Sequence, residues 1–163
     1  MIEYNNRWFL IVGACDSGKV LTFPLDRIDD FHVRYDRSYI SVPDDLQERY
    51  EEIIGVTFKE ENPLQEIVFW ISDKSKDYII TKPMHGSQKT LRGATELSLR
   101  SSYPDLKNGG FFQIECRENY ELLRELTSFG PELIVLSPKS IAEKIYNQLQ
   151  SMLANYSHAK EIE

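Results

Sequence analysis

The chain has 163 residues, of which 41% are hydrophobic and 28% are charged, with a net charge of −7 and a pI near 5.1. This length is enough for one medium domain or two small ones with a buried core. The acidic balance repels DNA, so duplex binding by this chain alone is not expected. No apolar stretch approaches the roughly 20 residues of a membrane span, and the amino terminus has no signal pattern. The sequence therefore predicts a cytoplasmic protein without membrane contact.

Residues 13–20, "GACDSGKV", match seven of the eight positions of the phosphate-binding loop G-x-x-x-x-G-K-[ST]. Val20 stands where that loop has the Ser or Thr that holds Mg²⁺. The residues that follow are β-branched and aromatic and include Pro24, which favours a strand over the required helix. The sequence therefore predicts a hairpin tip with a glycine at positive φ, and not a nucleotide-hydrolysing site.

The first third of the chain predicts a small antiparallel sheet. Residues 7–33 alternate apolar runs with the turn and predict two or three antiparallel strands. Pro43 opens a short amphipathic helix that Gly55 ends. The charged segment 59–65 lacks apolar periodicity, so it is the best candidate for a domain boundary.

The remainder predicts alternating strands and helices. Four apolar runs predict strands, at 66–71, 88–100, 109–117 and 132–137. Three helices are predicted, from Ser72 (where a strand stays an alternative), from the N-cap Asn119 and from Pro138. The last helix has an apolar face of Ile141, Ile145, Leu149, Met152, Leu153 and Tyr156. This order is the split βαββαβ, ferredoxin-like arrangement with an extra carboxy-terminal helix.

These blocks resemble a known family. Residues 4–33 resemble the WYL domain of bacterial transcriptional regulators, with Trp8-Phe9-Leu10 as the defining triplet and "LDRI" at 25–28 as a second marker. The segments 82–89, 119–138 and 145–156 resemble the WCX-type extension that follows WYL domains. The chain is thus similar to a WYL domain-containing regulator that lacks its amino-terminal winged helix.

The resemblance implies an α+β fold in two domains. Residues 1–60 would form a partial WYL domain, with strands of an Sm-like, SH3-type small β-barrel, and residues 64–163 the ferredoxin-like extension. The implied function is effector sensing and dimerisation for a transcriptional regulator, with a nucleotide, single-stranded nucleic acid or other anion as effector. Promoter DNA would be contacted only through the winged helix that precedes such domains. An oligomerisation module that senses no ligand is the alternative.

Six residues are candidates for ligand binding. Arg7 and Arg27 could hold an anion with their guanidinium forks, or could pair with the carboxylates at Asp26, Asp29 and Asp30. Tyr4 and Phe23 could stack on bases, although aromatic side chains in a small barrel more often belong to the core. Trp8 and Leu10 share one face of their strand and are expected to pack inward.

The other two candidates lie in the extension. His85 and Gln88 could contact an effector's polar edge, or could simply satisfy the backbone of their loop. The chain departs from the family pattern at two positions, because Leu21 and Pro24 stand where the family often has arginines. Each missing arginine removes a possible phosphate contact.

Catalysis is not expected from this sequence. His32, His85 and His158 have no metal-ligand spacing, and Ser87 lacks the glycine frame of a nucleophile elbow. Cys15 and Cys116 have no C-x-x-C spacing and are predicted to be buried free thiols. We therefore expect no metal, no cofactor and no enzyme activity. A homodimer is expected, because two-fold pairs are the commonest oligomers and the incomplete barrel leaves a sheet edge open.

Overall fold

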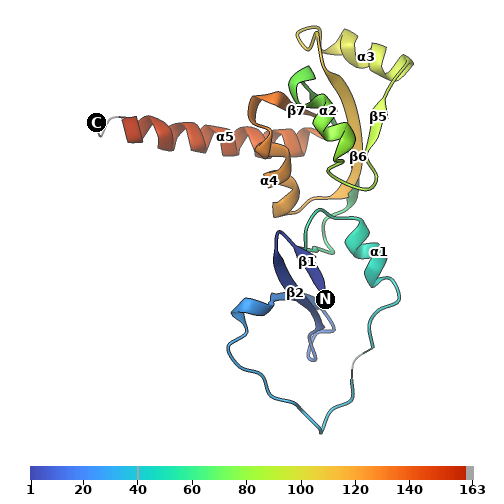
Figure 1. Ribbon diagram of the computed structural model, residues 1–163, viewed down its shortest axis with the longest axis vertical. Coiled ribbons are helices and arrows are strands. Elements are labelled where there is room, and N and C mark those ends of the chain that lie inside the picture. Colours follow the sequence, from blue (N-terminus) through green and yellow to red (C-terminus); the bar gives the residue numbers. More distant parts are fainter. Residues whose placement is uncertain (40, 161–163) are drawn as a thin grey trace.

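The computed structural model describes residues 1–39 and 41–160. It is a mixed α+β fold with two antiparallel sheets, one of three strands and one of four, as the sequence predicts. Figure 1 shows the three-stranded sheet below the four-stranded one, with the last helix projecting to one side. Within the described residues, no helix combines the length and apolar character needed to cross a membrane.

The amino-terminal sheet has the strand order β1-β2-β3, from β1 (Ile2–Tyr4), β2 (Arg7–Gly13) and β3 (Val20–Pro24). Gly18 at the tip of the β2–β3 hairpin has a φ of +65°, and its amide donates to the carbonyl of Ala14 at 2.8 Å. This confirms the predicted hairpin tip. A short 3-10 helix, η1 (Leu25–Arg27), follows β3 directly.

One face of this sheet is apolar but uncovered. The strand register places Trp8, Leu10 and Phe23 on the same face, and Trp8 is 50% exposed. The expectation that Trp8 packs inward is therefore wrong. The opposite face, which carries Phe9 and Ile11, is the more covered one. A sheet of only three strands has no second layer to bury both faces.

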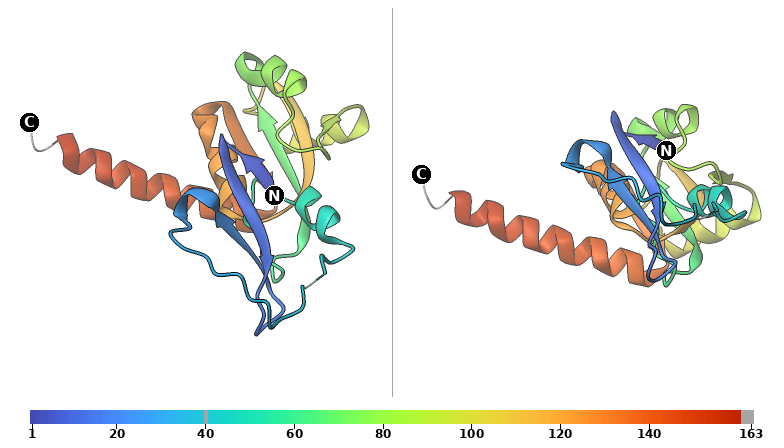
Figure 2. Two further views of the ribbon diagram at one scale, coloured as in Figure 1. Left: turned by 60° about the horizontal axis from the view of Figure 1, so that its bottom comes forward. Right: turned by 90° about the horizontal axis from the view of Figure 1, so that it is seen from below.

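A long loop and helix α1 (Leu46–Glu51) connect this sheet to the second one. The helix is shorter than the predicted span of 43–55, but Gly55 ends the segment with a φ of +84°, as expected. In the left view of Figure 2 the loop passes the tip of the β2–β3 hairpin on its way to α1.

The four-stranded sheet has the order β5-β6-β4-β7, and every neighbouring pair is antiparallel. Its strands are β4 (Leu64–Ile71), β5 (Lys89–Leu91), β6 (Gly110–Arg117) and β7 (Leu133–Ser137). Phe69 and Phe112, on the two central strands, stack with ring centroids 5.8 Å apart and are fully buried. The core of the molecule lies on this sheet.

Three of the helices that connect or follow these strands lie where the sequence predicts helices. They are α2 (Asp73–Thr81), α4 (Tyr120–Ser128) and α5 (Lys139–Lys160), with a 3-10 turn η2 (Gly130–Glu132) before β7. The helical reading of the segment from Ser72 is thus confirmed, as is the cap of α4, because Asn119 accepts from the amide of Leu122 at 2.8 Å. Leu122 and Leu126 on α4 are buried in the core.

The structure corrects the predicted strand over 88–100. Only Lys89–Leu91 form a strand, and residues 94–102 form helix α3 (Ala94–Ser102). Arg100 explains the preference, because it pairs with Glu96 one turn earlier at 2.7 Å and lies 5.2 Å from the ring centre of Phe111. Such i, i+4 pairs stabilise a helix and have no equivalent in a strand.

Two further expectations are wrong in part. Cys116 is buried, and burial raises the pKa of its thiol to about 11, but Cys15 at the hairpin is exposed. In α5 only Ile141 of the predicted apolar face is buried, and the residues from Leu149 onward are exposed. The periodicity predicted an apolar face correctly, but no residue in the described part of the chain covers that face beyond Ile145.

Candidate functional site

The two sheets are held together through the segment that joins them. Arg117 on β6 donates from Nε to the carboxylate of Glu52 at 2.5 Å and from Nη1 to the carbonyl of Asn62 at 2.7 Å. Arg124 on α4 donates to the hydroxyl of Tyr4 at 3.1 Å, and its guanidinium carbon lies 5.9 Å from the centre of the tyrosine ring. The corner between β6 and α4 therefore holds both the connecting segment and β1.

Asn119 adds a second function to its capping role at this corner. Its side-chain amide donates to the carbonyl of Ile54 at 2.8 Å and to that of Thr57 at 3.0 Å. The side chain is 3% exposed, so these bonds are made away from water. A buried amide with both of its ends satisfied fixes the connecting segment against α4.

Glu121 holds the same segment from the first turn of α4. Its Oε1 accepts from the hydroxyl of Thr57 at 2.8 Å and from the amide of Val56 at 3.4 Å. Gly55 passes so close that a Cβ there would lie 2.5 Å from Cγ of Glu121. This contact, together with its positive φ, makes a glycine necessary at position 55.

A cleft of about 700 Å³, here called the joint cleft, opens beside these contacts. Its walls come from β1, the end of α1 with the following turn, and the loop before β5. The polar and aromatic side chains that line it are Tyr4, Tyr50, Glu51, Glu52, His85, Ser87 and Glu115. None of the described residues that line it is a Lys or an Arg. This carboxylate-rich cleft is unsuited to an anion.

His85 is the histidine of the joint cleft, and its neighbours hold its ring. Its Nδ1 lies 2.7 Å from the hydroxyl of Ser87, which also bonds to the backbone of Glu115. Burial lowers the pKa of His85, and a hydrogen bond with the backbone of Glu51 opposes this effect only in part. The imidazole is therefore neutral at neutral pH and brings no positive charge to the cleft.

Gln88, the neighbouring candidate, holds its own loop together. Its Nε2 donates to the carbonyl of Ile79 at 2.8 Å, and its Oε1 accepts from the amide of Met84 at 3.0 Å. One end of the side-chain amide thus binds helix α2, and the other binds the loop between α2 and β5. This matches the alternative in which a loop side chain satisfies nearby backbone.

A second cleft, here called the loop cleft, lies between the β2–β3 hairpin and the segment 34–46. Its volume is about 640 Å³, and Leu10 and Val12 contribute to its apolar floor. Arg34, Arg37 and Tyr39 line it from the loop. Among the described lining residues there is no Asp or Glu, so this cleft has the opposite electrostatic character to the joint cleft.

The two arginines of the loop cleft differ in their freedom. Arg34 donates from Nε and Nη2 to the carboxylate of Asp36, at 2.8 and 2.6 Å, and this pairing lowers the pKa of Asp36. Arg37 makes no ion pair with any residue in the described part of the chain. Tyr39 is 83% exposed, so its ring is available for stacking.

These three residues were not among the sequence candidates. The signal was present in "RYDRSY" at 34–39, where arginines and tyrosines alternate in the manner of single-strand binding segments. The resemblance to the family rests on other segments, and none of its markers falls within residues 34–39. Segments without regular structure carry binding residues more often than the elements that they connect.

The remaining sequence candidates lie outside both clefts. Arg7 pairs with Asp26 at 2.9 Å, which is the surface ion pair considered as its alternative. Arg27 is exposed on η1, and Phe23 is exposed on the uncovered face of the sheet. Of the six candidates, the structure brings only Tyr4 and His85 to the lining of one cleft.

Comparisons with known proteins place the second half of the chain in a family. A solved structure, the proteasome accessory factor B/C (PafBC) of Arthrobacter aurescens, is similar at a TM-score of 0.42 and 17% identity. That similarity covers 88% of this chain and 20% of the PafBC chain, so the chain spans about a fifth of that protein. No curated protein matches the sequence. The WCX domain matches residues 63–153, which is more than half of the chain, and such domains are found in WYL-associated regulators. The chain belongs to the WCX domain family.

Proposed function

We propose that this chain is the non-catalytic, effector-sensing region of a WYL-type transcriptional regulator, and that its effector is an anion bound in the loop cleft. The observation that carries this proposal is the convergence of Arg34, Arg37 and Tyr39 on a cleft without carboxylates in its described lining. A nucleotide or a short single-stranded nucleic acid has the matching chemistry, with phosphate for the arginines and a base for the tyrosine.

Arg37 has the leading role in this proposal. A guanidinium without a carboxylate partner can bind a phosphate without first breaking an ion pair. Arg34 is already paired with Asp36, which offsets its positive charge and occupies its fork, so Arg37 supplies the guanidinium that is free for a phosphate. The apolar floor formed by Leu10 and Val12 offers a surface for a base or sugar.

The proposal extends to the fold and to the assembly. The strand order β5-β6-β4-β7 with antiparallel neighbours supports the ferredoxin-like arrangement expected for residues 64–163. The three strands of residues 1–60 support a partial WYL sheet. Promoter contact would come from a DNA-binding domain outside this chain, and a homodimer would present two such domains to a palindromic site.

Fluorescence anisotropy of a short labelled single-stranded oligonucleotide, titrated with the chain at low and high salt, tests the effector site. Arg37→Ala is expected to weaken binding about tenfold at low salt, and binding should decline as salt rises. Arg27→Ala is the matched control, because it removes an exposed arginine outside both clefts. Its expected affinity is that of the wild-type chain.

Two results would contradict this assignment. Equal losses for Arg27→Ala and Arg37→Ala would mean that the anion binds to general surface charge. Absence of binding to oligonucleotides and to mononucleotides alike would favour the alternative function, an oligomerisation module that senses no anion.

A further inference from the structure

The second half of α5 extends away from the rest of the molecule. Ile141 is buried and Ile145 is half-buried, but every residue from 146 to 159 is exposed. Figures 1 and 2 show this part of the helix leaving the domain in all three views. At 1.5 Å per residue it is about 21 Å long. A lone helix of this length is marginal in water, so packing against a partner would stabilise it.

The composition of this exposed part is that of an interface. Residues 145–159, "IYNQLQSMLANYSHA", contain no Asp, Glu, Lys or Arg, although 28% of the whole chain is charged. A solvated helix normally carries charged side chains on its exposed faces. Depletion of charge and enrichment in Tyr and Met distinguish the centres of protein interfaces from ordinary surface. The exposed side chains that give this part its apolar character are Tyr146, Leu149, Met152, Leu153 and Tyr156.

The apolar positions are arranged symmetrically about Leu149. The residues three, four and seven positions before Leu149 are apolar, and so are the residues three, four and seven positions after it. The pairs are Tyr146 with Met152, Ile145 with Leu153, and Ala142 with Tyr156. Spacings of three, four and seven residues keep one stripe of a helix in contact with another helix. A pattern that is the same in both directions suits an antiparallel pair of identical helices whose two-fold axis passes Leu149.

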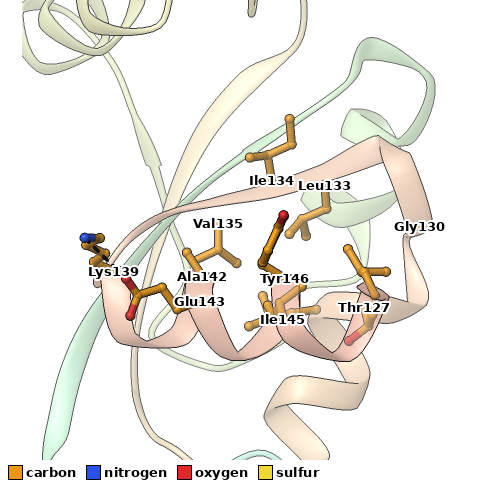
Figure 3. A pocket seen from close by; sticks show the side chains of 12 residues that line it. Thr127, Gly130, Leu133, Ile134, Val135, Lys139, Ala142, Glu143, Ile145 and Tyr146 are labelled. Carbon is orange, nitrogen blue, oxygen red and sulfur yellow. Dashed lines mark ion pairs between the residues drawn. The ribbon is translucent and has the colours of Figure 1, made fainter. Parts of the chain in front are cut away.

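The base of α5 offers a complementary surface. A groove of about 440 Å³ lies between β7 and the first turns of α5 (Figure 3). Ile134, Val135 and Ala142 line it, and Tyr146 stands beside them. In an antiparallel pair centred on Leu149, Tyr156 of the second copy would lie opposite Ala142. A large side chain would thus meet a small one at the edge of an apolar groove.

We propose that residues 142–156 of α5 form the dimer interface, by antiparallel pairing with α5 of a second copy about Leu149. This deepens the homodimer of the proposed function and does not depend on the anion cleft. The stripe carries no charge, so pairing it with the same stripe of a second copy puts no like charges opposite each other, although each chain has a net charge of −7. A stripe without Lys or Arg also has no attraction for nucleic acid or for anionic lipid.

Sedimentation equilibrium of the full chain tests this interface. The wild-type chain is expected to be a dimer at micromolar concentration, and Leu149→Glu a monomer, because the two introduced carboxylates would face each other on the axis. Ser151→Glu is the matched control. It adds the same charge about 200° around the helix from Leu149, and it should leave the dimer intact.

A mixture of Leu149→Glu and Leu149→Lys gives the sharpest result. Each variant alone is expected to be a monomer, and the mixture should form heterodimers, because position 149 of one copy meets position 149 of the other. Restoration also establishes that both variants are folded. A wild-type monomer would overturn the homodimer together with this interface. A dimer that survives Leu149→Glu, or an equal loss with Ser151→Glu, would overturn the interface alone. If the Leu149→Glu variant binds the oligonucleotide with wild-type affinity, a failure of the dimer or of the interface says nothing against the effector site.

Discussion

The two halves of the molecule reach stability by different means. Among the described residues from 1 to 52 no side chain is buried, whereas the four-stranded sheet and its helices contain a continuous apolar cluster. The amino-terminal sheet is joined to the second half by the hydrogen bond from Arg124 to Tyr4, and Asn119 fixes the connecting segment. A structure held by a few polar contacts opens at a lower free energy than one held by a core. If the proposed effector site is correct, this lower stability would let the first half respond to a ligand.

The largest expected effect comes from the core of the WCX domain. Phe69→Ala removes a fully buried ring that stacks on Phe112, and it should lower the free energy of unfolding by about 3–5 kcal/mol. Phe23→Ala, on the uncovered face of the amino-terminal sheet, should change it by less than about 1 kcal/mol. Urea denaturation of both variants measures the contrast. Equal losses would mean that the two halves share one core.

The joint between the halves should give an intermediate effect. Asn119→Ala removes the cap of α4 and both bonds to the connecting segment, so we expect a loss of about 2–3 kcal/mol. Asn119→Asp keeps the capping oxygen but places a buried carboxylate oxygen against the carbonyls of Ile54 and Thr57, so it should lose at least as much stability. Hydrogen exchange should show faster exchange in residues 1–57 than in β4 and β6 for both variants. A uniform increase over the whole chain would contradict a local role for the joint.

The smallest effect is the pH dependence carried by His85. Burial lowers the pKa of His85 in the folded chain below its ordinary value of 6.5, so the unfolded chain binds a proton first as the pH falls. Stability is therefore complete above about pH 6.5 and declines as the solution is acidified through that value. His85→Gln should flatten the part of the profile that lies below it, when both proteins are unfolded by urea between pH 5 and 7.5.

The control for this measurement is His32→Gln. The His32 side chain is exposed and lies beside Asp30 in the long loop, far in sequence from the joint. It should leave the wild-type profile unchanged. If His85→Gln and the wild-type chain lose stability in parallel on acidification, the imidazole is not the group responsible.

The sequence predicted much of the fold because its signals were local. The glycine of the hairpin tip, the cap at Asn119 and the apolar run of β4 each depend on residues within one turn or strand, and all are confirmed. Helix α3 was not predicted because its short segment fits both the strand and the helix periodicity. The contact of Arg100 with Phe111, which no local pattern shows, favours the helix.

The candidate site was less accessible to the sequence. Arg7 has a carboxylate partner, Asp26, on η1, and Gln88 has partners on α2 and in its own loop, so neither residue is free to bind an effector. The sequence offered those pairings as alternatives, but it could not decide between them. Which charged groups line the same cleft depends on how the long loop returns to the hairpin, and no local pattern encodes that path.

By itself, the sequence determined the class of the fold, the strand and helix character of most segments, and the apolar stripe of α5. These properties follow from backbone preferences and side-chain periodicity, which act over a few neighbouring residues. Only the tertiary structure decided which apolar faces are covered and which charges meet. The stripe of α5 is continuous in the sequence, but its second half extends beyond the domain because the four-stranded sheet is too small to cover it. Burial and charge pairing are properties of the whole assembly of elements, so they appear only when those elements have been packed.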